Sequence, residues 1–268
     1  MKQILDIVPN HMATNDSRNR WWWDVLEKGR ASRFAAYFDI DWDPPEEKLA
    51  RKILLPVLAD HYGRVLEAGE LRITTPGNFP VLLYHELELP LSQDSLLSFS
   101  TPDEVNSDYR QLHELLEQQH YRLAFWRTAF DDLNFRRFFS INDLVGLRME
   151  NNDAFEDAHT LVFEMANAGR LDGVRVDHAD GLSDPQAYLD RLQSRLGGRY
   201  IAVEKILEST EELPTSWPVQ GTTGYDFLNR VAALFVDRQS EAAFDSSTRA
   251  SSESMQQPPP NAGTTRSC

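Results

Sequence analysis

The sequence is poor in cysteine and in long apolar runs. It has one cysteine, Cys268, among 268 residues, so an internal disulfide cannot form. No stretch approaches the ~18 apolar residues of a membrane helix, and the first residues lack the apolar core and the cleavage site of a secretory signal. We therefore expect a cytoplasmic protein.

Positive charge is scarce as well. The chain has 27 Lys and Arg against 42 Asp and Glu, which gives a formal net charge of −15 at pH 7. Nucleic acid and anionic membrane would both be repelled by such a chain, so we expect neither as a partner. The seven histidines form no metal-ligand cluster, and we expect no metal and no cofactor.

Large apolar residues become rare after Phe244. The segment 245–268 is rich in Ser, Pro, Gln and Thr, a composition that does not build a packed core, so we expect a disordered tail there. The globular pattern stops in the middle of a domain, which favours a frameshift or the end of a gene fragment. A native flexible terminus is the alternative.

What the sequence does contain is a strand–helix–strand unit at residues 172–204. Asp184 is a suitable helix cap, Pro185 suits the first turn, and Gly197 with the following glycine ends the helix. Apolar residues recur between these signals at helical spacing, and a short apolar strand lies on each side. The two strands are expected to be parallel.

Acidic residues stand at the ends of both predicted strands. Arg175 and Asp177 share one face of the first strand because side chains alternate, and Glu204 follows the second strand directly. The carboxyl ends of parallel strands are where barrel and doubly wound enzymes hold their catalytic groups. The alternative is that both residues are surface carboxylates in structural ion pairs. That explanation would be preferred for a lone acidic residue, but it fits two acidic residues beside an arginine less well.

A third stretch, ILDIVPNH at residues 4–11, alternates so that Asp6 and Asn10 share a face before the chain turns. LDIVPNH, GVRVDHADGL and VEKIL resemble three of the four conserved stretches of the α-amylase family of glycoside hydrolases, in the same order. The longer runs NRWWWDVLEKG, HYRLAFWRT, RRFFSINDLVGLR and PVQGTTGYDF resemble its maltooligosyl trehalose synthase branch. The resemblance covers roughly residues 3–244.

The resemblance implies an α/β fold, a partial (β/α)8 TIM barrel with a large mixed, mostly helical insertion. The expected segments are a barrel strand with the first conserved stretch (1–11), an insertion with barrel helices (12–170), barrel strands and helices with the catalytic carboxylates (171–244) and the tail (245–268). The fourth conserved stretch is not found, and two strands are missing before the first one. We therefore expect an incomplete copy that has no activity by itself.

Residue roles follow from the resemblance position by position. Asp177 matches the catalytic nucleophile and Glu204 the general acid/base. The residues matched to substrate binding are Asn10, His11, Arg175, His178 and Lys205. A retaining mechanism places its two carboxyl groups about 5–5.5 Å apart, and we expect Arg175 to lower the pKa of Asp177 while Glu204 keeps its proton.

The implied reaction is an intramolecular transglucosylation of maltooligosaccharides. It converts the α-1,4 linkage of the reducing-end glucose into an α,α-1,1 linkage, a step of trehalose biosynthesis classed as isomerisation. Two alternatives stay open. One is a retaining α-glucan hydrolase, and the other is a non-catalytic fragment.

The insertion is expected to contain both helices and strands. Residues 70–75 and 79–87 are predicted to form a hairpin around Pro-Gly-Asn. Residues 108–120 and 153–168 are predicted to be helices, each with one apolar face, formed by Tyr109, Leu112, Leu115 and Leu116 in the first and by Phe155, Ala158, Val162 and Met165 in the second. The three adjacent tryptophans at 21–23 point in different directions on a helix. Taken singly, each of them is expected to pack in the core. One of the three is expected to contact the sugar substrate.

Overall fold

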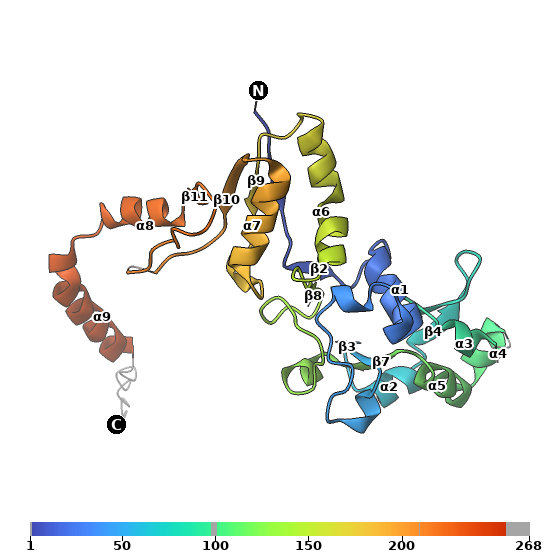
Figure 1. The fold of residues 1–268 in the computed structure, drawn as a ribbon. Coiled ribbons are helices and arrows are strands. Elements are labelled where there is room, and N and C mark those ends of the chain that lie inside the picture. The colour runs from blue at the N-terminus through green and yellow to red at the C-terminus, as the bar shows by residue number, and fades with distance from the viewer. Residues whose placement is uncertain (1, 98–100, 209, 256–268) are drawn as a thin grey trace, which may run out of the picture. The chain divides into compact units, whose positions relative to one another are not determined.

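The structure is a computed structural model that describes residues 2–97, 101–208 and 210–255 (Figure 1). It divides into two compact units. The first comprises the residues up to Lys205 together with Glu212–Thr223, and the second comprises Ile206–Glu211 and the residues from Gly224 onward. Each unit is described by itself below.

A four-stranded parallel sheet in the first unit carries the candidate site. Its spatial order is β1 (Ile4–Ile7), β9 (Gly173–Val176), β10 (Tyr200–Val203) and β11 (Gly221–Thr222). The inward side chains of β9 and β10 are fully buried, as is usual for parallel strands covered by helices. The helices α6 (Asn152–Asn167) and α7 (Pro185–Leu196) lie beside this sheet (Figure 1). The fold is α/β.

The predicted strand–helix–strand unit is confirmed. The Asp184 carboxylate accepts a hydrogen bond from the Ala187 N–H at 2.9 Å, Pro185 occupies the first turn of α7, and Gly197 ends the helix with φ +63°. This left-handed conformation costs glycine little. β9 and β10 pair in parallel with Arg175 opposite Ala202.

The predicted helix at 153–168 is confirmed as α6, but its buried face differs from the expected one. Phe155 and Val162 are buried as expected, whereas Ala158 is exposed and His159 is buried in its place. The His159 ring is held at both nitrogens, because Nε2 lies 2.8 Å from the Tyr188 hydroxyl and Nδ1 lies 2.8 Å from the Phe155 carbonyl. Two such hydrogen bonds allow a polar ring to be buried.

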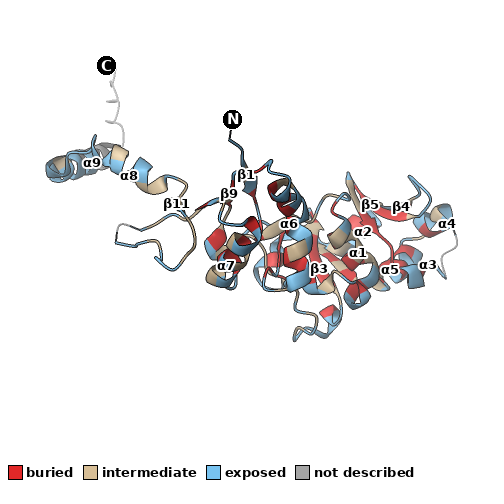
Figure 2. Cartoon of the chain, turned by 45° about the horizontal axis from the view of Figure 1, so that its top comes forward, coloured by how far each residue is buried: buried red, intermediate tan, exposed pale blue. Residues whose placement is uncertain are grey.

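The segment between β1 and α6 is a mixture of short helices and three small sheets. The sheets pair β2 (His11–Ala13) with β8 (Leu144–Gly146), β3 (Ile53–Leu58) with β7 (Tyr121–Phe125), and β4 (Leu71–Thr74) with β5 (Val81–Tyr84) and β6 (Leu87–Pro90). The helices are α1 (Arg20–Lys28), α2 (Tyr62–Glu67), α3 (Gln93–Leu96), α4 (Pro102–Ser107) and α5 (Tyr109–Glu117). Figure 2 shows buried residues running through these elements.

The predicted hairpin is confirmed, but its second strand is shorter than the predicted one and ends at Tyr84. β4 and β5 pair antiparallel around the Pro-Gly-Asn turn, and the chain then turns again at His85 instead of continuing to residue 87. His85 has φ +52°, a conformation more typical of glycine or asparagine. Because this turn contains neither residue, no local pattern predicts it.

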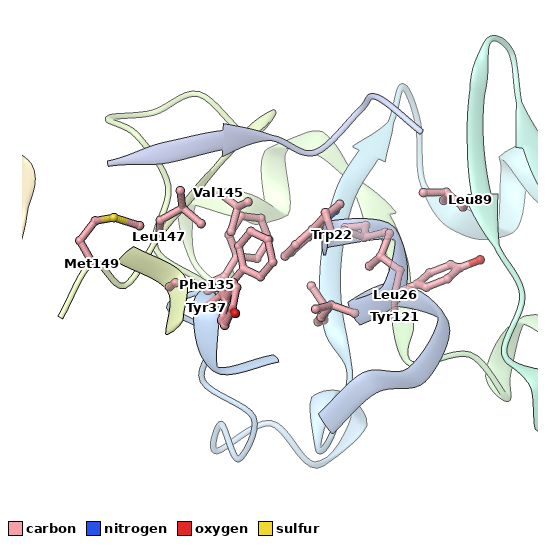
Figure 3. Packing of buried hydrophobic residues seen from close by; sticks show 14 of the residues in the cluster. Trp22, Leu26, Tyr37, Leu89, Tyr121, Phe135, Val145, Leu147 and Met149 are labelled. Carbon is pink, nitrogen blue, oxygen red and sulfur yellow. The ribbon is translucent and has the colours of Figure 1, made fainter. Parts of the chain in front are cut away.

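The core of the insertion gathers around α1. The Trp22 side chain is 1% exposed and meets the rings of Phe38 and Phe135 edge to face at 5.0 and 5.7 Å (Figure 3). Trp21 is half-buried and stacks on Phe34 at 5.8 Å, and Trp23 is half-buried too. Core packing is therefore right for Trp22 and partly right for its two neighbours.

Helix α5 agrees with the predicted helix at 108–120 in position, though it ends earlier. Leu112, Leu115 and Leu116 are buried as expected, but Tyr109 at the first position is exposed. A residue in the first turn lies at the end of the apolar stripe, where its side chain can turn to solvent.

The second unit consists mainly of α8 (Tyr225–Ala233) and α9 (Glu241–Met255). We expected a disordered tail from residue 245 onward. The structure instead continues helix α9 as far as Met255. Alanine and glutamate favour helix, and serine opposes it only weakly. The rest of the expected tail, 256–268, lies outside the described residues, as does Cys268. Within the described ranges we find no helix with both the length and the apolar character needed to cross a bilayer.

Candidate active site

Arg175 on β9 stands at the centre of a cluster of carboxylates. Its Nη1 donates to both oxygens of Asp6 at 2.7 and 2.9 Å and to Oδ1 of Asp177 at 2.9 Å. Its Nη2 lies 3.4 Å from Oε2 of Glu204. The pairing register explains this geometry, since Asp6 on β1 is directly opposite Arg175. One guanidinium thus connects acidic residues from three neighbouring strands.

Asp177 and Glu204 both leave the sheet at its carboxyl edge. The Asp177 N–H donates to the Ile7 carbonyl at 2.9 Å, and the Glu204 N–H donates to the Val176 carbonyl at 2.7 Å. These bonds extend the parallel ladders by one residue and fix the backbone from which each carboxylate projects. The two acidic side chains are about four-fifths buried.

The pKa of Asp177 differs from the sequence-based expectation. Burial raises the pKa of Asp177 above its ordinary value, and a hydrogen bond with Glu204 raises it further, while Arg175 opposes both effects. We expected Arg175 to prevail. It does not, because burial of the carboxyl group disfavours its charged form and because Arg175 divides its charge among three carboxylates.

The side chains of Asp177 and Glu204 are close enough to interact. Arg175 contacts both of them, at 2.9 and 3.4 Å, and the interaction with Glu204 contributes to the raised pKa of Asp177. Two neighbouring carboxyl groups are what a retaining mechanism requires.

Asn10 and His11 lie beside this cluster. Asn10 is 1% exposed, and its Oδ1 accepts a hydrogen bond from Nη1 of Arg136 at 2.9 Å. Its Nδ2 lies 3.4 Å from Nδ1 of His11. Burial lowers the pKa of His11, and the nearby His178 and Arg136 lower it further. A neutral imidazole has one donor and one acceptor nitrogen, which suits hydrogen bonding to hydroxyl groups.

His178 connects the two parts of the site. Its backbone N–H donates to Oε2 of Glu204 at 3.3 Å, and its ring lies 4.8 Å from Phe138, which lies 4.2 Å from the His11 ring. A Cβ at Gly181 would come within 2.2 Å of the His178 ring. Glycine is therefore required in the loop that holds this histidine.

Lys205 reaches the same loop from β10. Its Nζ lies 3.6 Å from Oδ2 of Asp180, and Oδ1 of Asp180 lies 3.8 Å from Nδ1 of His178. All seven residues predicted for the site are thus linked by contacts. We detect among the described residues no group of three or more His, Cys, Asp or Glu side chains that could hold a metal ion.

Arg136 is the main residue that the prediction missed. Besides Asn10, it binds Oδ2 of Asp39 at 3.0 Å and the Leu147 carbonyl at 2.6 Å. Gly146 makes room for it, since a Cβ there would lie 2.6 Å from the guanidinium carbon. The signal was present in RRFFSINDLVGLR, but nothing in that run indicates that it folds back onto residues 10 and 11.

The geometry defines a class of chemistry. An aspartate and a glutamate stand at the carboxyl ends of adjacent parallel strands, with an arginine on one strand and ring-bearing side chains around them. Such an arrangement can supply a nucleophile and a proton donor, the two groups that a retaining glycosyl-transferring enzyme uses.

Comparison with known proteins identifies the relatives of the chain. A Mycobacterium tuberculosis protein (strain CDC 1551 / Oshkosh) assigned as maltooligosyl trehalose synthase is 39% identical over 244 residues, which is 90% of this chain. The chain spans only 28% of that relative's length. No protein-family model matches the chain.

Solved structures give the same result. Maltooligosyltrehalose synthase from Arthrobacter ramosus is 40% identical with a TM-score of 0.77, covering 90% of this chain and 29% of that one. A Sulfolobus tokodaii protein described as a hypothetical maltooligosyl trehalose synthase is 38% identical with a TM-score of 0.67, covering 84% and 27%. The resemblance to maltooligosyl trehalose synthases is confirmed, and the small share of each relative agrees with the expected partial copy.

Proposed function

We propose that this chain carries the nucleophile and the proton donor of a maltooligosyl trehalose synthase. The observation that supports the proposal most strongly is the Asp177–Glu204 pair bridged by Arg175 at the end of adjacent parallel strands. The substrate is a maltooligosaccharide, and the product is its α,α-1,1-linked isomer, a maltooligosyl trehalose. The chain's relatives are named for this activity.

In the first half of the reaction, Glu204 donates its proton to the oxygen of the terminal α-1,4 linkage. The Asp177 carboxylate attacks the anomeric carbon, so the C–O bond to the reducing-end glucose breaks and a glycosyl-enzyme ester forms. The linkage lies between the two carboxyl groups during this step. Arg175 contacts Asp177 and stabilises its charged form.

In the second half, the released glucose turns and presents its anomeric hydroxyl. Glu204 takes the hydroxyl proton while the oxygen attacks the same anomeric carbon, which displaces Asp177. Asn10, His11, His178 and Lys205 bind sugar hydroxyls and keep the free glucose in place. If water replaced the glucose, the same residues would produce a hydrolase instead.

The fold assignment is part of the proposal. The sheet β1-β9-β10-β11 is all parallel and its spatial order follows the chain order, which supports four consecutive strands of a (β/α)8 barrel with the site at its carboxyl end. The segments 1–11, 12–170, 171–244 and 245–268 are the proposed divisions. A cytoplasmic location stays a prediction.

Replacement of the matching stretch in the Arthrobacter ramosus enzyme by this chain's sequence tests the proposal. We expect the hybrid to convert maltopentaose to a product without a reducing end, with the unmodified relative as its control. Asp177→Asn and Glu204→Gln in the hybrid should each lower the rate at least about a thousandfold, because each removes a separate chemical step. Unchanged conversion in either variant would refute the assigned roles, and release of glucose alone would favour a hydrolase.

A further inference from the structure

Phe139 is an exposed aromatic residue at the edge of the candidate active site. Its side chain is 72% exposed, although it belongs to the run Arg136–Phe139 that braces the site. The ring lies 5.1 Å from the His178 ring and 4.5 Å from the Phe138 ring. A single exposed aromatic residue is common on a protein surface, so it is the position of this ring beside the loop of His178 that makes it informative.

The backbone at Phe139 is strained as well. Its φ is +47°, in the left-handed region that bulky side chains avoid. Arg51, His85, Phe139 and His178 are the non-glycine residues with positive φ in the described part of the chain. Phe139 and His178 touch each other, which places two of these conformations at the site. Strain of this kind clusters at functional sites.

The turn that holds Phe139 does not itself require a phenylalanine. It is closed by backbone hydrogen bonds on either side, from the Phe138 N–H to the Leu144 carbonyl at 3.0 Å and from the Ile141 N–H to the Phe138 carbonyl at 3.0 Å. Glycine would adopt the same conformation at less cost. The side chain, and not the turn, is therefore what needs an explanation.

We propose that Phe139 is a sugar-stacking residue whose exposed ring receives the apolar face of a glucose unit beside Asp177 and Glu204. The inference rests on the proposed function, because it names a binding surface for the same substrate. His178 links the two places, since its backbone N–H reaches Glu204 and its ring packs against Phe139. A glucose ring has an apolar C–H face suited to an aromatic ring and hydroxyls suited to the surrounding polar groups.

The test measures maltopentaose binding to the full 268-residue chain by calorimetry. We expect Phe139→Ala to weaken the affinity about tenfold, the loss of one aromatic contact, and Phe139→Trp to retain it. The matched control is Phe79→Ala, which removes an equally exposed phenylalanine, 73% exposed, from the β4–β5 turn. This control should leave the affinity unchanged.

A second variant separates binding from folding. Phe139→Gly should weaken binding as Phe139→Ala does while raising Tm, because it relieves the backbone strain and removes little buried surface. Arg51→Gly, at another position with positive φ, should raise Tm without affecting binding. A fall in Tm for Phe139→Gly would assign the ring a structural role and overturn the proposal.

The binding measurements have three further outcomes, and each leads to a different conclusion. If the unmodified chain binds maltopentaose and Phe139→Ala binds it equally well, the stacking role is wrong and the proposed function survives. If Phe139→Ala leaves the affinity unchanged but reduces self-association, the ring is a protein contact, and the inference is again overturned. If the unmodified chain does not bind maltopentaose, the inference is overturned, whereas the proposed function is decided separately by the hybrid enzyme.

Discussion

Single residues decide how closely the loops of the site can approach one another. A Cβ at Gly181 would lie 2.2 Å from the His178 ring and 3.2 Å from Oδ1 of Asn10. We predict that Gly181→Ala destabilises the chain by about 1–3 kcal/mol, the usual cost of overpacking. Urea unfolding measures the difference. Gly77→Ala is the control, because a Cβ at Gly77 meets nothing within 4 Å; an equal loss in both variants would contradict the packing argument.

The raised pKa of Asp177 predicts a pH dependence of stability. Its pKa is raised in the folded chain, so its protonated form contributes stability that is full below the unfolded value of about 3.8 and is lost as pH rises through the folded pKa. Asp177→Asn cannot titrate. Relative to that variant, the unmodified chain should lose unfolding free energy on going from pH 3 to pH 7. A constant difference would show that the pKa of Asp177 is not raised in the folded chain.

At the scale of elements, α6 and α7 are joined by a buried polar contact. The Tyr188 hydroxyl on α7 lies 2.8 Å from Nε2 of His159 on α6, and both residues are buried. Tyr188→Phe leaves that nitrogen without its partner. We predict a loss of about 1–3 kcal/mol, measured by chemical unfolding. Tyr200→Phe, at an exposed position, should cost much less, and equal costs would argue against the buried contact.

The same scale shows what a sequence can predict. Helix α7 was predictable at both ends because Asp184, Pro185 and Gly197 act within a few residues of chain. Arg136 was not, since its partner Asn10 is 126 residues away and neither position carries a local signal for the other. The direction of the Asp177 pKa was missed for a similar reason. It depends on how three carboxylates share one arginine, which only the assembled strands determine.

At the scale of the whole molecule, the second unit exposes a large apolar surface. Leu234, Phe235 and Val236 are 81%, 84% and 64% exposed, more than isolated surface residues would account for. We predict concentration-dependent self-association, which sedimentation velocity measures and which Leu234→Ser with Phe235→Ser should reduce. Leu161→Ser on α6, also an exposed leucine, should not reduce it. Association that survives the double substitution would locate the contact elsewhere.

The pairing of β1 with β9 has a consequence for the order of folding. The hydrogen bonds between Arg175 and Asp6 close a loop of 169 residues, and such distant contacts form slowly because the chain entropy of closure must be overcome first. The antiparallel sheet β4–β5–β6 and the helices between these strands are built from contacts close in sequence, so they can form earlier and shorten the effective loop. The carboxylates of the candidate site would then meet only in the last stage of folding. The insertion would thus guide the assembly of the site as well as contribute Arg136, which binds Asn10, to its surroundings.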